Sequence, residues 1–292
     1  LAGWYTVQVP ALAACIALLR RFWDESRTWL GLLVTLAVVL SWPSTRVTLF
    51  YAQSTFLLIL AILLVMLAQS PAWRGLWLGL AMVIKPIAAI LAIDLVVRRQ
   101  WRSLLALLVP PILALGLFLL AQGWPGLMYY KDRNPIAGDV AFVYYAEPAN
   151  QSLLGVLLRF FESPPLVRPI FYPPFVLLGG LLTAVTVAAL ICLPLRFASL
   201  GIGYLVTLAL LVYPGTLMHY SVLLLIPAAL LWRERTSLPG GPPAVILIIA
   251  MAYGLDWSRS SFAAHLFTWT SFTLLLTLAS VKRHAPSPAP SL

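Results

Sequence analysis

Long apolar runs separated by short groups of basic residues dominate the chain. A helix rises about 1.5 Å per residue, so about 20 apolar residues cross roughly 30 Å of hydrocarbon. The pattern predicts an all-α, polytopic transmembrane helical bundle of about 9–11 membrane segments. The expected spans are residues 1–19, 28–42, 47–68, 103–122, 175–195, 197–213, 217–232, 244–255 and 264–281.

The basic residues predict how this bundle lies in its membrane. Lys and Arg hold loops on the cytoplasmic side. If the spans simply alternate, most basic clusters fall on one side, and Leu1 lies outside. We therefore expect residues 1–284 to form a single transmembrane domain in the plasma (inner) membrane, crossing it several times. Residues 285–292 are rich in Pro and Ser and are expected to form a disordered cytoplasmic tail.

One segment, residues 75–97, breaks this alternation. Arginine stands on both flanks, at Arg74 and at Arg98, and Lys85 and Pro86 lie in the middle. A lysine at mid-bilayer is costly, and a proline disrupts the preceding helical turn. Two half-length helices, or a re-entrant hairpin with Lys85 near its tip, satisfy both constraints. Non-helical backbone at this depth is tolerated where it is buried in protein or lines a wet cavity, so we expect Lys85 to face a cavity.

A long polar interruption covers residues 123–174, and alternation places this loop outside the cytoplasm. Within it, residues 150–161 have leucines at helical spacing. The segment is too short to span a bilayer and suits the membrane surface. We expect a short amphipathic surface helix here.

Composition excludes several classes of function. Hydrophobic residues make up 62% of the chain and charged residues 10%, against about 25% charged residues in soluble domains. The net charge of +10 does not indicate nucleic-acid binding, because no solvated basic face fits beside so much apolar sequence. Cys15 and Cys192 lie in apolar runs and are typical of core residues. Soluble-enzyme motifs such as phosphate loops and HExxH are missing, and we expect no metal and no cofactor.

Polar groups at membrane depth are functional candidates by default. Lys85 is the strongest, because it sits about ten positions from either end of its segment; the alternative is a lysine that reaches the membrane surface. Asp94 is weaker, because it lies close to Arg98 and pairing between the two would explain it.

Three further residues carry candidate chemistry, each with an ordinary alternative. His219 follows a Tyr-Pro-Gly sequence and is expected at the outer mouth of the bundle. Its ordinary alternative is a structural histidine that is hydrogen-bonded to a neighbouring residue. Gln53 opens its span, where a polar cap is common. Arg159 projects from the expected surface helix, and the ordinary alternative for it is a contact with a lipid headgroup. Together these cations and amides suit a phosphate presented from the lipid leaflet.

Three segments resemble glycosyltransferase family 87. Residues 51–102 contain a Gln opening a span, a small-residue GLWLGLA segment, the Lys-Pro pair and a basic-Trp-basic cluster. Residues 150–160 look like the Asn-x-Ser segment of the family followed by an Arg. Residues 214–227 resemble its late Pro…His…Pro span. The three segments occur in the order of the family and cover roughly residues 51–232.

The resemblance implies an inverting GT-C type hexosyltransferase. Such enzymes move a hexose, typically mannose, from a polyprenyl-phosphate donor to a lipid or glycan acceptor on the extracytoplasmic face. The catalytic Asp of the family lies in an early outward loop, so it is expected upstream of Leu1, in a chain truncated at its N-terminus. The implied donor-phosphate and substrate-binding residues are Lys85, His219, Arg159, Gln53, Asn150 and Ser152.

A transporter or flippase of a lipid-linked or small anionic substrate is the competing interpretation. Broken helices and a midplane lysine fit that class as well. A large outward loop with a surface helix fits it less well, and a purely structural membrane subunit leaves Lys85 unexplained.

Overall fold

The computed structural model describes residues 2–23, 28–133, 150, 152, 201–213, 216–236 and 240–257. Within these ranges every regular element is a helix, and one isolated bridge joins Asn150 to Leu217. The expected all-α class is confirmed for this part of the chain. The amphipathic segment 150–161 (Asn150 and Ser152 apart), the apolar runs 175–195 and 264–281, and the tail 285–292 lie outside the described residues.

The first elements are α1 (Ala2–Trp23), α2 (Trp29–Ser41), α3 (Pro43–Phe50) and α4 (Thr55–Leu67). The hydroxyl oxygen of Thr28 caps α2 by accepting from the Gly31 N–H at 3.0 Å, and α2 and α3 meet at 64°. The prediction of one span over residues 47–68 is wrong, because the chain leaves the helix after Phe50. Ala52 has φ of 50°, and the Gln53 N–H returns to the Thr48 carbonyl at 2.9 Å.

The segment with arginine on both flanks is a hairpin. Its elements are α5 (Pro71–Ile84), the 3-10 helix η1 (Pro86–Leu91) and α6 (Ala92–Val97). Lys85 stands between α5 and η1 in extended conformation, with φ −153° and ψ 125°. A guanidinium nitrogen of Arg74 donates to the Gln100 side chain at 3.1 Å, so both ends of the hairpin lie together. The prediction that this segment is broken at Lys85 is confirmed.

The next helix, α7 (Trp101–Arg133), packs along α5. A Cβ at Gly75 would overlap the Ser103 carbonyl oxygen, and one at Gly79 would overlap the Leu107 carbonyl oxygen. The two glycines, four residues apart, therefore let α5 and α7 approach backbone to backbone. Gly123 interrupts α7 with φ 66°. The polar interruption expected from residue 123 thus begins as a kink, and the chain continues as helix to Arg133.

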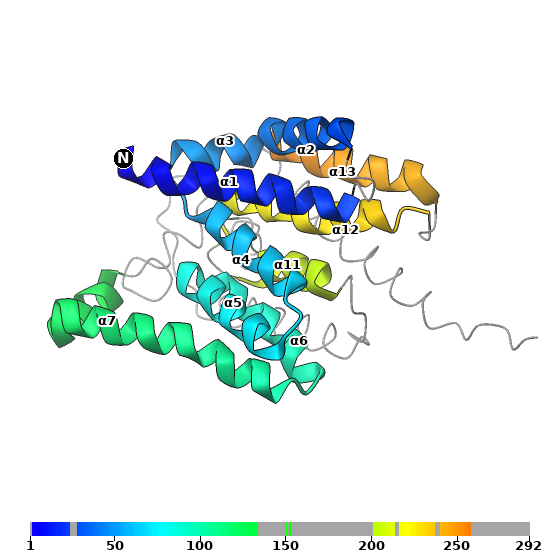
Figure 1. Ribbon diagram of the computed structural model, residues 1–292. Coiled ribbons are helices and arrows are strands. Elements are labelled where there is room, and N and C mark those ends of the chain that lie inside the picture. The colour runs from blue at the N-terminus through cyan, green and yellow to red at the C-terminus, as the bar shows by residue number, and fades with distance from the viewer. Residues whose placement is uncertain are drawn as a thin grey trace, which may run out of the picture.

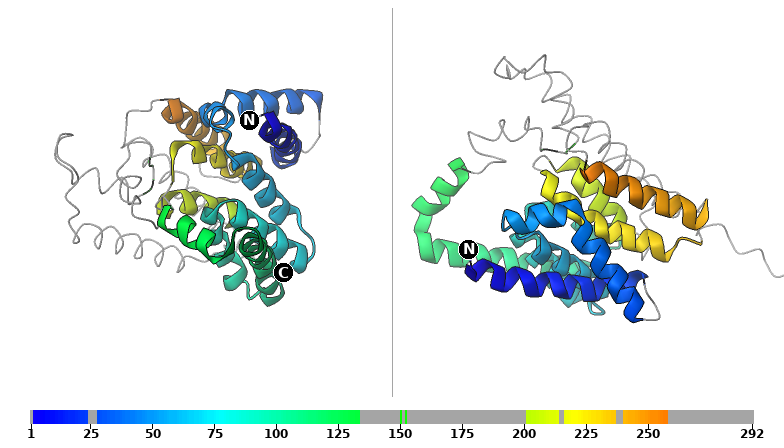
Figure 2. Two further views of the ribbon diagram at one scale, coloured as in Figure 1. Left: turned by 90° about the vertical axis from the view of Figure 1, so that its left-hand side faces the viewer. Right: turned by 90° about the horizontal axis from the view of Figure 1, so that it is seen from above.

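The later elements are α11 (Gly201–Val212), η2 (Met218–Leu224), α12 (Leu225–Arg233) and α13 (Gly241–Trp257). In Figures 1 and 2, α4, α11 and α12 lie between a layer of α1, α2, α3 and α13 and a layer of α5, α6 and α7. Leu205, Leu210, Leu225 and Leu231 are fully buried in this middle layer. The layer supplies much of the apolar core that holds the hairpin in place.

The lengths of the described helices and the positions of their basic ends can be compared with the predicted membrane arrangement. Among them, α7 alone is long and apolar enough to cross a bilayer, and the bent pair of α2 and α3 adds a second candidate span. The other apolar helices are shorter, so the multi-pass arrangement stays a prediction. The C-terminal ends of α1 and α12 and the N-terminal end of α7 all point to the right-hand side of Figure 1. Arg20, Arg102 and Arg233 belong to these ends, which agrees with the one-sided clustering of basic residues.

Candidate functional site

The ammonium group of Lys85 is the centre of a buried polar cluster at the hairpin tip. Its Nζ lies 3.3 Å from Gln53 Oε1, 3.1 Å from Thr55 Oγ1 and 3.2 Å from His219 Nε2. An ammonium has three N–H donors and no acceptor, so these three atoms are its acceptors. His219 must then leave Nε2 unprotonated and carry its proton on Nδ1. Lys85, 7% exposed, is held between the start of α4 and η2.

Local sequence explains why these side chains converge. Pro86 has no backbone N–H and disfavours helical backbone at the residue before it, so α5 ends and Lys85 becomes extended. The turn between α3 and α4 brings Gln53 to the start of α4, where Thr55 is the first helical residue. His219 comes from η2, which packs against α3. Each of the three partners stands at or near the end of a helix.

An aromatic face completes the cluster. Lys85 Nζ lies 4.0 Å from the centroid of the Tyr220 ring, a distance that gives a cation–π attraction. The rings of His219 and Tyr220 stack, with centroids 4.5 Å apart. Among the described residues no carboxylate forms an ion pair with Lys85. All observed partners of this buried cation are therefore neutral.

The wall beside the cluster is rich in hydroxyl groups. Thr48 Oγ1 donates to the His219 carbonyl at 3.3 Å, and the hydroxyls of Ser44 and Ser221 share a hydrogen bond. Thr45 Oγ1 is buried and has no hydrogen-bond partner among the described residues. A buried hydroxyl without a partner is costly unless a water or a ligand satisfies it. The wall is therefore polar, uncharged and incompletely hydrogen-bonded.

The structure brings together three of the six residues predicted for this site. Lys85, His219 and Gln53 meet directly. Asn150 and Ser152 are fully buried, and Asn150 pairs through its backbone with Leu217, two residues before His219. The Asn150 side chain accepts from the Ser152 N–H at 2.9 Å. Arg159 lies outside the described residues. The binding roles of all six stay predictions.

Asp94, the weaker candidate, does not join the cluster. Its Oδ1 lies 2.7 Å from Arg98 Nε one helical turn away, so the pairing considered from the sequence is present. Sequence reasoning missed Thr55 and Tyr220, although both stand within two residues of a predicted site residue. A threonine that opens an apolar helix and a tyrosine in the first turn of another apolar segment are ordinary residues. No local pattern indicates that Lys85 meets a residue 134 positions later.

Comparison with known proteins identifies the family. The search found no matching curated protein and no matching solved structure. The family model described as Glycosyltransferase family 87 matches residues 1–214 of the 292. This match contains the hairpin, Lys85, Gln53 and the Asn150 segment. The chain therefore belongs to glycosyltransferase family 87.

Proposed function

We propose that this protein is a multi-pass plasma-membrane glycosyltransferase that takes a hexose, typically mannose, from a polyprenyl-phosphate donor. The acceptor is a lipid or glycan on the extracytoplasmic face. The observation that carries the proposal is the buried Lys85 ammonium, whose described partners are all neutral. Burial of a charge without a counter-charge is costly, and a donor phosphate would supply that counter-charge. We expect no cofactor in this reaction.

The contacts of Lys85 allow a donor phosphate to replace one of its present partners. The hydrogen bond to Gln53 is the longest of the three, at 3.3 Å, and Gln53 is partly exposed whereas Thr55 is fully buried. A phosphate oxygen that replaces Gln53 would leave the bonds to Thr55 and His219 intact. A charge-assisted hydrogen bond of this kind contributes about 1.5–3 kcal/mol.

The chemistry of transfer assigns this cation to the leaving group. As the acceptor hydroxyl attacks the anomeric carbon, the bond from that carbon to the phosphate oxygen breaks and charge collects on the lipid phosphate. A preorganised cation in a site shielded from water stabilises that charge. Among the described residues no carboxylate contacts the cluster. We therefore assign donor binding and leaving-group stabilisation to it, and not deprotonation of the acceptor.

The uncharged wall supports a sugar as the transferred group. A hexose presents several hydroxyls and no charge, and it is matched by neutral donors and acceptors. The hydroxyl of Thr45 is buried without a partner among the described residues. Groups of this kind gain most from a ligand or a water that completes their hydrogen bonds.

Membership in a glycosyltransferase family favours group transfer over transport. A broken hairpin with a buried lysine would by itself be compatible with a transporter. The two classes differ in product, because only the enzyme transfers labelled sugar from the donor to an acceptor.

Replacement of Lys85 by alanine tests the phosphate role. In membranes containing the full-length protein and radiolabelled polyprenyl-phosphate mannose, Lys85→Ala should lower donor use about tenfold to a hundredfold. Lys131→Ala is the control, because Lys131 is an exposed lysine near the end of α7 and should leave donor use unchanged. Donor turnover at the parent rate by a folded Lys85→Ala protein would overturn the assignment.

The predicted topology has its own test. In a background that lacks Cys15 and Cys192, a cysteine at Asn134 should react with an impermeant reagent in intact cells. A cysteine at Arg99 should react only after the membrane is broken, because the basic end is expected to be cytoplasmic. The reverse pattern of labelling would contradict the orientation.

A further inference from the structure

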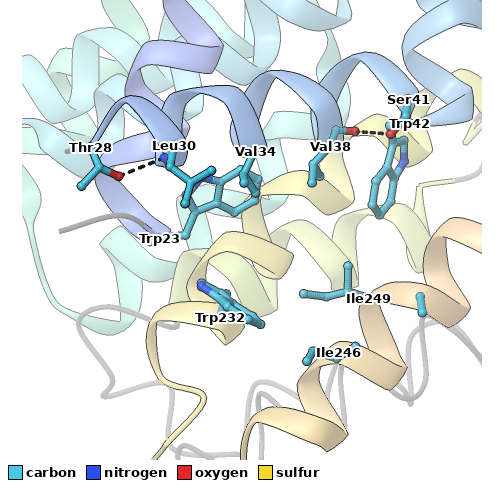
Figure 3. A pocket seen from close by; sticks show the side chains of 12 residues that line it. Trp23, Thr28, Leu30, Val34, Val38, Ser41, Trp42, Trp232, Ile246 and Ile249 are labelled. Carbon is cyan, nitrogen blue, oxygen red and sulfur yellow. Dashed lines mark hydrogen bonds between the residues drawn. The ribbon is translucent and has the colours of Figure 1, made fainter. Parts of the chain in front are cut away.

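An open groove of about 550 Å³ lies at some distance from the Lys85 cluster and shares no residue with it. As Figure 3 shows, α2 forms one side and α12 and α13 form the other. Trp23, Thr28 and Trp232 gather at one end, and Trp42 lies at the opposite end. Between the ends the lining side chains are aliphatic, among them Val34, Val38, Ile246 and Ile249.

Two arginines contact the tryptophan-rich end of the groove. A guanidinium nitrogen of Arg20 donates to the Thr28 carbonyl at 2.8 Å. The guanidinium of Arg235 lies 4.8 Å from the Trp232 ring centroid and also donates to the Trp232 carbonyl at 2.8 Å. The loops 24–27 and 237–239 lie outside the described residues. Within the described part of the chain, Arg20 and Arg235 contact lining residues, while Arg233 and Glu234, directly after Trp232, pair with each other at 3.4 Å. The described side chains at this end therefore carry a net positive charge.

Three of the polar groups that line the groove are already hydrogen-bonded. The Thr28 hydroxyl caps α2, and the Ser41 hydroxyl donates to the Val38 carbonyl at 3.3 Å. The Trp23 indole N–H donates to Thr35 at 2.6 Å. The walls therefore favour an apolar chain, while the mouth favours an anion. A molecule with both parts is an anionic amphiphile.

We propose that this groove binds an anionic glycerophospholipid of the surrounding membrane. One acyl chain lies between α2 and α13, and the lipid phosphate lies between Arg20 and Arg235. Tryptophan is enriched at the level of lipid headgroups, and basic pockets between helices on the cytoplasmic side bind anionic headgroups. The arginine-rich ends of α1 and α12 belong to this side in the predicted orientation. The site is independent of donor binding at Lys85.

Native mass spectrometry of the full chain tests the proposal. Protein stripped of lipid is supplied with dioleoyl phosphatidylglycerol or dioleoyl phosphatidylcholine, which have the same acyl chains and differ in their headgroups, anionic in the first and zwitterionic in the second. The parent protein should retain one phosphatidylglycerol molecule in clear preference. The preference should fall about fivefold for each arginine removed, in Arg20→Gln, in Arg235→Gln and in the double variant.

Two further variants separate the groove from general charge effects. Val34 is 50% exposed, so Val34→Trp fills the groove without adding volume to the buried core. This variant should lower retention of both lipids. Arg102→Gln, an exposed arginine on α7, should change nothing. Equal retention of the two lipids by the parent protein would overturn the proposal, as would an unchanged preference in the double variant. A dimer mass in place of a lipid adduct would assign the groove to a second copy of the chain and would also overturn it.

Discussion

Lys85 and Asp94 are two buried charges on one hairpin, and they differ in how their charge is balanced. The two residues are almost equally buried, at 7% and 6% exposed. Asp94 lies 2.7 Å from Arg98, one turn away on the same helix end. Lys85 has an amide, a hydroxyl, an imidazole and an aromatic ring as partners. One charge is neutralised within its own segment, and the other is surrounded by neutral groups from two other segments, residues 53–55 and 219–220.

The difference indicates which of the two charges serves function. An ion pair within one helix stabilises that helix and needs no further partner. An ammonium held by neutral dipoles has no counter-charge in the described structure, so an anion at this site would stabilise its charged form. Lys85 and Asp94 are buried to the same degree, so burial alone does not indicate which of them serves function. The partner groups differ, and substitutions that change these groups test the difference.

A carboxylate placed beside Lys85 should have the largest effect. Gln53→Glu keeps the shape of the side chain 3.3 Å from Nζ and gives Lys85 the kind of partner that Asp94 has. We expect donor use to fall about tenfold to a hundredfold because the carboxylate competes with the phosphate. Thermal stability in detergent should rise, since the buried charge is neutralised.

Gln100→Glu is the matched control for this change. Gln100 contacts Arg74 at 3.1 Å at the opposite end of the hairpin, so the same substitution creates an ion pair away from the cluster. Donor use should stay at the parent level. An equal loss in both variants would mean that charge anywhere on the hairpin disturbs activity.

Loss of the Asp94 carboxylate should act on stability instead. Asp94→Asn removes the charge-assisted hydrogen bond to Arg98, whose side chain is 23% exposed. We expect the free energy of unfolding to fall by about 1–2 kcal/mol. The donor KM of the folded enzyme should not change. A donor KM raised as far as in Lys85→Ala would place Asp94 in the binding machinery and end the contrast between the two charges.

The shape of the Lys85 site can be probed with its charge kept. Lys85→Arg retains the cation but adds a larger planar fork, so we expect donor use to fall roughly threefold to tenfold. Lys85→Met is similar in length and uncharged, and it should lose as much as Lys85→Ala. Parent-level donor use in the Met variant would show that the charge is dispensable.

The smallest effects should come from the hydroxyl wall. Thr48→Val removes the donor to the His219 carbonyl and should cost about 1 kcal/mol of unfolding free energy. Thr45→Val removes a hydroxyl that has no partner among the described residues and should leave stability unchanged or slightly higher. Both threonines are 1% exposed, so differential scanning fluorimetry of the pair compares hydrogen bonding at equal burial. Equal losses would contradict the assignment.

The hairpin was predictable because its signals are local and strong. Arginine on both flanks and a Lys-Pro pair in the middle exclude a simple crossing, whatever surrounds the segment. The turn after Phe50 was not predictable, because residues 47–68 are apolar apart from a few small polar side chains. The positive φ of Ala52 and the hydrogen bonds from Gln53 N–H to Thr48 and from Ala52 N–H to Leu49 form a Schellman cap, and the usual sequence signal for it, a glycine, is replaced here by Ala52.

The sequence indicated several residues that form the site, but it did not indicate how they are arranged in space. Lys85, Gln53 and His219 stand out as polar groups in apolar sequence. Thr55 and Tyr220 do not stand out, since their importance comes from contacts across 30 or more positions. The neutral character of every Lys85 partner is a tertiary property, and it is this property that distinguishes Lys85 from Asp94.

Direct binding of the donor phosphate tests the central claim without the sugar-transfer step. The full-length protein is titrated with polyprenyl monophosphate and with the corresponding polyprenol, for the parent chain and for Lys85→Ala. We predict that the parent chain prefers the phosphate by about tenfold to a hundredfold. Lys85→Ala should lose this preference while its affinity for the polyprenol stays the same. Full retention of the phosphate preference by Lys85→Ala would contradict the account.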